Sequence, residues 1–304
     1  MNRISNMNRK ESSLKLKAEM ILLGVVVIWG YTFPVIKNVL LEIPPFTFLS
    51  YRFLLAFTVI YLIFSKQLRR IELQTIKDGF LVGLFLFIGY FGQTVGTQFT
   101  TATKTAFITG TSVILVPIFS FCWLKEKIQL NSVIGVLLAM IGLWLMNSNG
   151  TLYHINLGDS LVFLGAVGFA LYIIAVHIYT KKHDYVQLVF IQLITVALLS
   201  FLMAIITERE ALHFSYSFSV YWAIVVTGIF ATALAFYLQN RYQRYSSPTK
   251  IALIFAAEPV FGALFSYLIL GETIGVFGFL GGLAIFAGMF IAQKEKTEDE
   301  LEKI

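Results

Sequence analysis

Apolar runs separated by short polar connections fill the chain from residue 18 to residue 292. A helix of roughly 20 apolar residues crosses a hydrocarbon core of about 30 Å, and ten runs approach this length. A lipid-facing backbone has no water to bond with, so each run predicts a helix that satisfies its own N–H and C=O groups. The pattern therefore predicts an all-α membrane protein with ten transmembrane helices, at residues 18–40, 46–64, 75–96, 104–124, 131–146, 158–180, 187–207, 220–241, 249–270 and 273–292.

Part of this pattern occurs twice, because residues 93–142 match residues 239–288 at a constant offset of 146 and without a gap. The identical pairs include polar residues and glycines: Gln93 and Gln239, Thr103-Lys104 and Thr249-Lys250, Ser120 and Ser266, Glu126 and Glu272, Gly135 and Gly281, Gly142 and Gly288. Such a repeat in a hydrophobic chain is typical of transporters built from two copies of one helical unit. We expect five-helix halves at 18–147 and 157–292, with a basic tail at 1–17 and a charged tail at 293–304.

The Lys and Arg residues predict how these helices lie in the membrane. With the N-terminal tail in the cytoplasm, 19 of the 23 Lys and Arg residues fall on the cytoplasmic side. Positive charge is enriched on that side of a cell membrane, so both termini are expected there. An odd number of helices per half then makes the second half enter the membrane in the opposite direction. We therefore expect two inverted five-helix repeats around a central cavity.

Composition supports a membrane protein and excludes several other classes. With 58% hydrophobic and 13% charged residues, the chain differs from ordinary soluble domains. Its net charge of +6 comes from short loops and tails, which favours contact with a lipid bilayer over nucleic acid. The single cysteine, Cys122, allows no internal disulfide, and the four histidines have no metal-ligand spacing. No cofactor and no metal ion are expected.

Several short motifs give the chain a family resemblance. They are Trp29-Gly30-Tyr31-Thr32-Phe33, Tyr51-Arg52-Phe53, the segment TKTAFIT at 103–109, Leu115-Val116-Pro117, Ala257-Glu258-Pro259, and the paired ends Leu124-Lys125-Glu126 and Leu270-Gly271-Glu272. In these motifs the chain resembles the EamA family of the drug/metabolite transporter superfamily. The resemblance implies a basket of helices in which the first four of each half line a central cavity and the fifth packs at the periphery. It also implies transport of amino acids and other small metabolites, usually outward.

Two charged residues inside apolar helices are the foremost candidates for substrate contact, because such charges are costly and usually face a cavity or a partner. Glu258 is expected near the middle of its helix, as a proton-titrating or cation-binding carboxylate. Arg52 is expected to bind a substrate carboxylate or phosphate with its guanidinium fork. The alternative for both is a structural ion pair with each other. The repeat does not duplicate either charge, since Ser112 stands opposite Glu258 and Gln192 stands opposite Arg52.

Other polar and aromatic residues complete the expected cavity. The polar candidates are Gln93, Thr109, Ser112, Tyr172, Gln192 and Gln239, for which interhelical hydrogen bonding is the alternative role. The aromatic candidates are Trp29, Tyr31, Tyr90 and Tyr237, for which packing is the alternative. A further group is expected to shape helix ends, kinks or gates: Glu126, Glu272, Pro117 and Pro259.

These features together predict a secondary carrier, not an enzyme, that exports a small metabolite such as an amino acid by alternating access. A coupled proton or cation and a homodimer are both left open. A membrane-embedded enzyme or a channel is the alternative, although no HExxH, GxSxG or P-loop motif favours an enzyme. No filter-like loop or ring of like charges favours a channel.

Overall fold

The computed structural model describes residues 2–100, 102–125, 129–147, 156–271 and 275–293, in which helices are joined by short turns and loops and no strand occurs. The first half contains α1 (Asn2–Val39), α2 (Pro45–Phe64), α3 (Leu73–Phe99), α4 (Ala102–Gly110), α5 (Ser112–Leu124) and α6 (Leu130–Asn147). The second half contains α7 (Leu157–Tyr179), α8 (Tyr185–Thr207), η1 (Arg209–Ala211), α9 (Phe218–Gly228), η2 (Ile229–Leu234), α10 (Ala235–Tyr242), η3 (Gln243–Tyr245), α11 (Pro248–Phe255), α12 (Glu258–Leu270) and α13 (Val276–Gln293).

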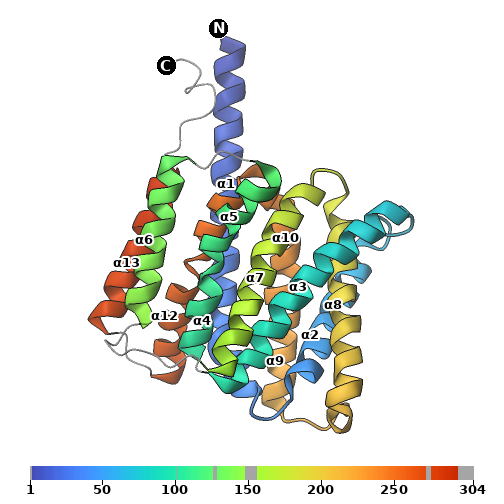
Figure 1. The fold of residues 1–304 in the computed structure, drawn as a ribbon. Helices are drawn as coiled ribbons and strands as arrows, with labels where there is room; N and C mark the ends of the chain where they lie inside the picture. The colour runs from blue at the N-terminus through green and yellow to red at the C-terminus, as the bar shows by residue number, and fades with distance from the viewer. Residues whose placement is uncertain (1, 101, 126–128, 148–155, 272–274, 294–304) are drawn as a thin grey trace.

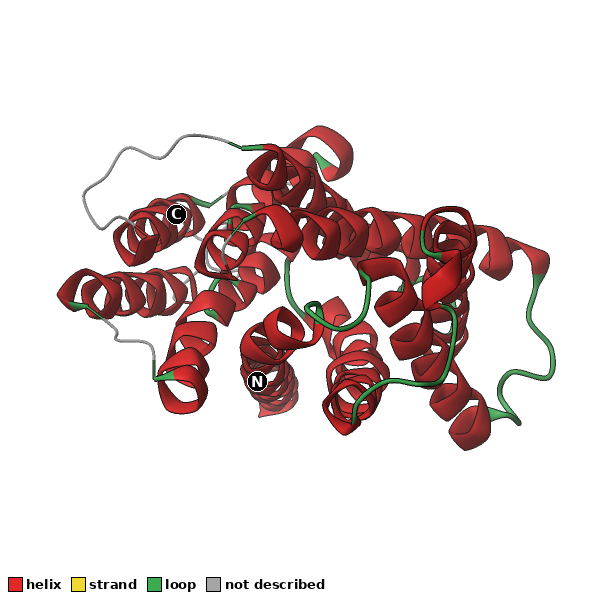
Figure 2. Cartoon of the chain, turned by 90° about the horizontal axis from the view of Figure 1, so that it is seen from below, coloured by secondary structure: helices red, strands yellow, loops and turns green. Residues whose placement is uncertain are grey.

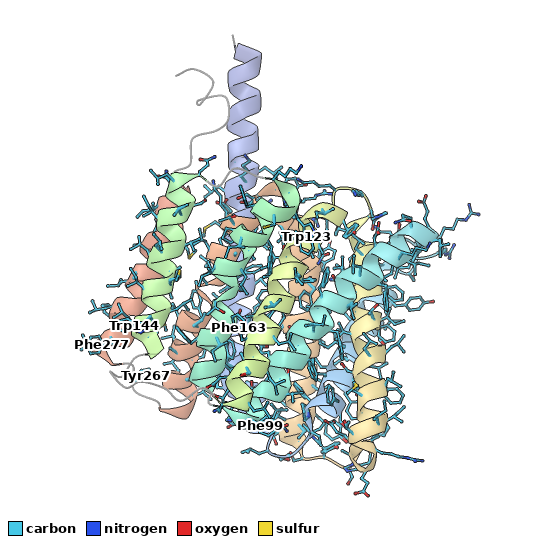
Figure 3. All side chains as sticks on the ribbon, in the orientation of Figure 1. Phe99, Trp123, Trp144, Phe163, Tyr267 and Phe277 are labelled. Atoms are coloured by element: carbon cyan, nitrogen blue, oxygen red, sulfur yellow. The ribbon has the colours of Figure 1, made fainter. Side chains whose placement is uncertain are left out.

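In the part of the chain that the structure describes, eight helical segments are long and apolar enough to cross a membrane, and α6 and α13 are shorter apolar helices. Large apolar side chains cover the outside of the bundle, including Trp123, Trp144 and Tyr267, each more than half exposed. In Figure 3, Trp123 lies toward the end of the bundle where α1 enters, while Trp144 and Tyr267 lie toward the opposite end. This surface fits lipid, with aromatic rings near both interfaces.

The helices α6 and α13 lie side by side at one edge of the bundle (Figures 1 and 2). Glycines allow their backbones to touch: a Cβ on Gly135 would lie 2.7 Å from the carbonyl oxygen of Gly288, and one on Gly142 would lie 2.5 Å from that of Gly281. Close backbone approach at small residues is the usual way for helices to associate in lipid. The two helices therefore run antiparallel with little room for side chains between them.

Helix α2 is joined to the end of α8 by one carboxylate. Glu208 accepts hydrogen bonds from the backbone N–H of Phe46, at 3.1 Å, and from that of Thr47, at 2.7 Å. These N–H groups belong to the first turn of α2, where no partner exists within the helix. Glu208 thus caps α2 from a distant part of the chain.

Three helices expected to be continuous are interrupted. The expected helix at 104–124 is broken at Thr111 between α4 and α5, and the helix at 249–270 is broken at Ala256 and Ala257 between α11 and α12. Pro259, at the second position of α12, has no N–H to continue the preceding helix. The two breaks lie at matching positions, because Thr111 corresponds to Ala257 in the repeat. The helix expected at 220–241 contains the π-helical turn η2.

The start of the first helix also differs from the expectation. Residues 2–17, expected as a tail, continue α1, which begins at Asn2 and projects beyond the rest of the bundle (Figure 1). The end of α13 lies at this same end of the molecule (Figure 1).

Candidate functional site: a central cavity with two opposite charges

A central cavity lies between α1, α2, α3, α4, α5, α7, α10, α11 and α12, and encloses about 930 Å³ including its open mouth. On α3 its lining runs from Tyr90 to Thr97, within two residues of the helix end at Phe99. On α4 the lining begins at Thr105, close to the start of that helix. The cavity therefore extends from the middle of the bundle toward the end opposite the N-terminus of α1 (Figure 1).

Arg52 brings a positive charge to this cavity, although only 1% of the residue is exposed. Its Nε donates to the Thr232 hydroxyl at 2.7 Å, and its Nη2 donates to the Tyr90 hydroxyl at 3.3 Å. The guanidinium carbon also lies 4.9 Å from the centre of the Tyr90 ring. A guanidinium has five N–H donors, so these contacts fix its position and leave donors for another acceptor.

Glu258 brings a negative charge to the same cavity, at the first residue of α12. The break before α12 places this carboxylate at a helix N-terminus, the end of a helix dipole that favours negative charge. Among the described residues, no ion pair joins Arg52 to Glu258 within 4.0 Å, and no hydrogen bond from a described residue reaches the Glu258 carboxylate. The two charges therefore share one cavity without forming the structural ion pair considered as an alternative.

Aromatic rings form the apolar walls of the cavity. The indole of Trp29 donates to the carbonyl oxygen of Ala231 at 2.9 Å, and its ring meets Phe255 edge-on at 5.1 Å between centroids. Tyr90 meets Phe169 edge-on at 5.3 Å. Rings packed in this way have few rotamers available, so the walls are well defined.

A line of polar side chains follows α3 and α4 along the cavity. The Gln93 amide donates to the Thr109 hydroxyl at 3.2 Å, and the Thr97 hydroxyl donates to that of Thr105 at 3.2 Å. Beyond the cavity, the Lys37 ammonium donates to the last carbonyls of α3, at Thr97 and Thr100, 3.2 Å from each. Lys37 therefore stabilises the C-terminus of α3.

A buried polar network lies where α7 meets α10, toward the end from which α1 projects. The Tyr172 hydroxyl donates to the Gln239 side chain at 3.4 Å and accepts from the Asn240 amide at 3.2 Å. Gln239 donates to Gln243 at 2.8 Å, and Gln243 donates to the carbonyl oxygen of Ile173 at 2.6 Å. Gln239, Asn240 and Gln243 have no exposed surface. Tyr172 and Gln239 also line the cavity, so the network borders the cavity on this side.

The structure gathers most of the candidate residues around this cavity. Nine of the twelve cavity candidates line it, as does Pro259: Trp29, Arg52, Tyr90, Gln93, Thr109, Ser112, Tyr172, Gln239 and Glu258. Whether these residues contact a substrate stays a prediction. Pro117 is buried within α5, away from the lining. Glu126 and Glu272 lie outside the described residues.

Three cavity candidates lie elsewhere. Tyr31 faces away from the cavity on α1 and packs edge-on against Phe265, with ring centroids 5.4 Å apart. Tyr237 stacks on Phe64 at 5.1 Å and accepts a hydrogen bond from Arg241. Gln192 is completely buried on α8, which contributes no residue to the lining. Tyr31 and Tyr237 lie on helices that line the cavity but do not themselves belong to its lining, whereas Gln192 lies on a helix outside the lining.

Thr232, Asn240 and Gln243 were not predicted from the sequence. One available signal was the spacing of Gln239 and Gln243, four residues apart and therefore on one helix face. Nothing comparable marks Thr232, because its importance comes from the π-helical turn that contains it.

Comparison with known proteins agrees with this architecture. The model of the EamA-like transporter family matches residues 16–148 and again residues 156–293. An uncharacterized transporter of Archaeoglobus fulgidus is 34% identical over 92% of this chain and 87% of its own length. The uncharacterized transporter YetK of Bacillus subtilis is 27% identical over 94% of this chain and 88% of its own length.

One solved crystal structure shares the fold, with a TM-score of 0.74 over 91% of this chain and 96% of its own. At 17% identity this likeness concerns the fold alone. The two family matches and the 34% identical relative confirm the resemblance drawn from the sequence motifs. The chain is a membrane transporter that belongs to the EamA-like transporter family.

Proposed function

We propose that the protein is a secondary carrier that moves a small zwitterionic metabolite, such as an amino acid, out of the cell by alternating access. Two inverted five-helix halves move around the central cavity, with both termini in the cytoplasm. The cavity that contains both Arg52 and Glu258 is the observation that carries this proposal.

The contacts of the repeated residues support two inverted halves. Gly135 meets Gly288, and Gly142 meets Gly281. In the repeat, Gly135 corresponds to Gly281 and Gly142 corresponds to Gly288. Each contact is therefore the counterpart of the other, which is the pattern that a two-fold axis produces. The matching breaks in the fourth helix of each half support the same relation, and paired discontinuous helices are where such carriers bind substrate.

The chemistry of the cavity favours a zwitterion. The free donors of Arg52 suit a carboxylate, which accepts two parallel hydrogen bonds from a guanidinium. The carboxylate of Glu258 suits an ammonium group and is also the place where a proton or another cation would bind. The aromatic walls suit an apolar side chain, as in most small-molecule sites, where a few polar groups fix a ligand among apolar surfaces.

Transport by purified protein in proteoliposomes tests this function. We expect saturable counterflow of radiolabelled standard amino acids, and outward movement when preloaded cells express the protein. Arg52→Gln should abolish the counterflow, whereas Tyr31→Phe, outside the cavity, should leave it unchanged. Flux that does not saturate, or ohmic currents across a planar bilayer, would instead indicate a channel.

A further inference from the structure

The π-helical turn η2 presents unusual hydrogen-bonding groups to two cavity residues. In an α-helix the N–H of Ala235 would donate to the carbonyl of Ala231. Here it is directed to the carbonyls of Phe230 and Thr232, which leaves the Ala231 carbonyl free of its usual partner. That carbonyl accepts the indole hydrogen bond of Trp29. Short π-helical turns often lie at functional sites.

Thr232, on the same turn, holds Arg52. Its hydroxyl donates to the carbonyl of Thr227 at 2.8 Å and accepts from Nε of Arg52 at 2.7 Å. The first bond directs the hydroxyl hydrogen away from Arg52, so a lone pair faces the guanidinium. Thr232 has no exposed surface and does not line the cavity. It therefore acts on the cavity only through Arg52.

Fixing Nε decides which edge of the guanidinium faces the cavity. Nε is occupied by Thr232, and one Nη2 hydrogen is directed to Tyr90. Within the described part of the chain, Arg52 donates side-chain hydrogen bonds from Nε and Nη2 and none from Nη1. The edge formed by Nη1 and Nη2 keeps donors that a carboxylate oxygen pair can accept.

We propose that Thr232 is a positioning residue for substrate: it fixes Nε of Arg52 so that the Nη edge binds the substrate carboxylate. This proposal rests on the carrier function proposed above. Without the hydroxyl, Nε would be left buried and unpaired, and the guanidinium would turn toward another acceptor. Binding of the carboxylate should then weaken, while the rest of the transport cycle continues.

Counterflow of radiolabelled standard amino acids into proteoliposomes tests the proposal. Thr232→Val removes the hydroxyl at almost constant volume, and Thr232→Ala removes it with less crowding. Both should raise KM about tenfold while leaving the maximal rate nearly unchanged. Thr232→Ser retains the hydroxyl and should restore the wild-type KM. The matched control is Thr227→Val, which removes an equally buried hydroxyl that bonds only within its own helix, to Ala223.

A purely structural role for Thr232 predicts different results. The decarboxylated amine of each amino acid has no carboxylate for Arg52 to bind. The inhibition constant of this amine in the counterflow assay should therefore be the same in wild type and Thr232→Val. Equal weakening of amines and amino acids would overturn the proposal. So would an unchanged KM in both Thr232→Val and Thr232→Ala, in which case the carrier function would stand without it.

A second measurement does not depend on the substrate. Exchange of the Arg52 Nε hydrogen with solvent, followed by NMR on isotope-labelled arginine, should be slow in wild type and in Thr227→Val, and faster in Thr232→Val. Unchanged exchange in Thr232→Val would also overturn the proposal. If the wild-type protein carries no standard amino acid, the carrier function as proposed fails, and the exchange rate alone decides whether Thr232 fixes the guanidinium.

Discussion

Arg52 and Glu258 are the residues at which two similar halves become different from each other. Their counterparts in the repeat are Gln192 and Ser112, neither of which carries a charge. The structure brings both charges to one cavity and leaves them without a direct ion pair among the described residues. A charge inside a membrane protein is stable only with a suitable partner. Here a bound zwitterion would partner both charges at once.

Replacing Glu258 by Gln should therefore weaken the binding of compounds that have an ammonium group and leave the binding of compounds without one unchanged. Glu258→Gln removes the negative charge and nearly keeps the shape of the side chain. We expect the ratio of maximal rate to KM for amino acids to fall about 10- to 100-fold, the loss typical of a hydrogen bond to a charged group. Competition by the corresponding 2-oxo acids, which have no ammonium, should not weaken. Initial rates of counterflow with both classes of compound measure this difference.

Two results would count against this role of Glu258. An equal loss for amino acids and 2-oxo acids would indicate a structural role in the break before α12. Full activity of Glu258→Gln at every pH tested would also exclude titration of this carboxylate during transport. Gel filtration in detergent shows whether the variant is folded.

At the scale of single residues, the sequence indicated depth in the membrane better than direction around a helix. Glu258 and Arg52 could be singled out because a charge in an apolar run is conspicuous. Tyr31 and Tyr237 were predicted as aromatic walls of the cavity, yet both rings pack against phenylalanines outside it. Which way a side chain points around its helix depends on how the neighbouring helices pack. A helix surrounded by lipid and protein is apolar on all sides, so its sequence has little periodicity that would indicate this direction.

At the scale of helices, apolar runs predicted where helices exist but not where they break. The break at Thr111 falls at Gly110-Thr111-Ser112 and the break at Ala257 directly precedes Glu258, each within a run that is otherwise mostly apolar. Pro259 gave a local signal for one of them, because proline disfavours a helix before it. No proline stands at the corresponding position of the first half, which is Val113. In the first half the nearest proline is Pro117, within α5, whose ring disturbs the helix at the carbonyl of Val113.

The contact between α6 and α13 allows a stability test. Gly142→Ala would place a Cβ 2.5 Å from the Gly281 carbonyl oxygen and 2.7 Å from the Ile285 side chain. The helices must separate to admit it, so we expect a loss of about 1–3 kcal/mol, as for other overpacked contacts. Unfolding midpoints in detergent, measured by circular dichroism, should fall accordingly.

Gly24→Ala is the matched control for Gly142→Ala. Gly24 is exposed on α1, and an added Cβ there would meet nothing within 4 Å. Alanine favours a helix over glycine by about 0.5–1 kcal/mol, so this variant should be as stable as wild type or more stable. Similar midpoints for both variants would mean that the close contact between α6 and α13 is not needed for stability.

At the scale of the whole molecule, the cavity is asymmetric along the membrane normal. It extends toward the ends of α1 and α3, where Ile36 and Thr97 line it. In the other direction the fully buried Gln243 lies beyond it. If the termini are cytoplasmic, the structure corresponds to an outward-facing state. Alternating access then requires the network around Gln239 and Gln243 to open when the outer side closes.

Cysteine accessibility tests the hypothesis that the cavity faces outward. Cys122 is exposed on α5 and is first replaced by Ala, which gives a background without thiols. Single cysteines are then introduced as Ile36→Cys and Gln243→Cys. In intact cells, an impermeant thiol reagent should label Ile36→Cys and leave Gln243→Cys unlabelled. In inside-out vesicles the reagent reaches the cytoplasmic face, so Gln243→Cys should react only when the carrier turns to its inward-facing state. Labelling should be faster when amino acid is supplied at the extracellular face of the protein to drive exchange.

Labelling of Gln243→Cys from the extracellular side would show that the network does not seal the cavity. Labelling of Ile36→Cys only in inside-out vesicles would reverse the orientation of the termini, and with it the direction in which this conformation faces.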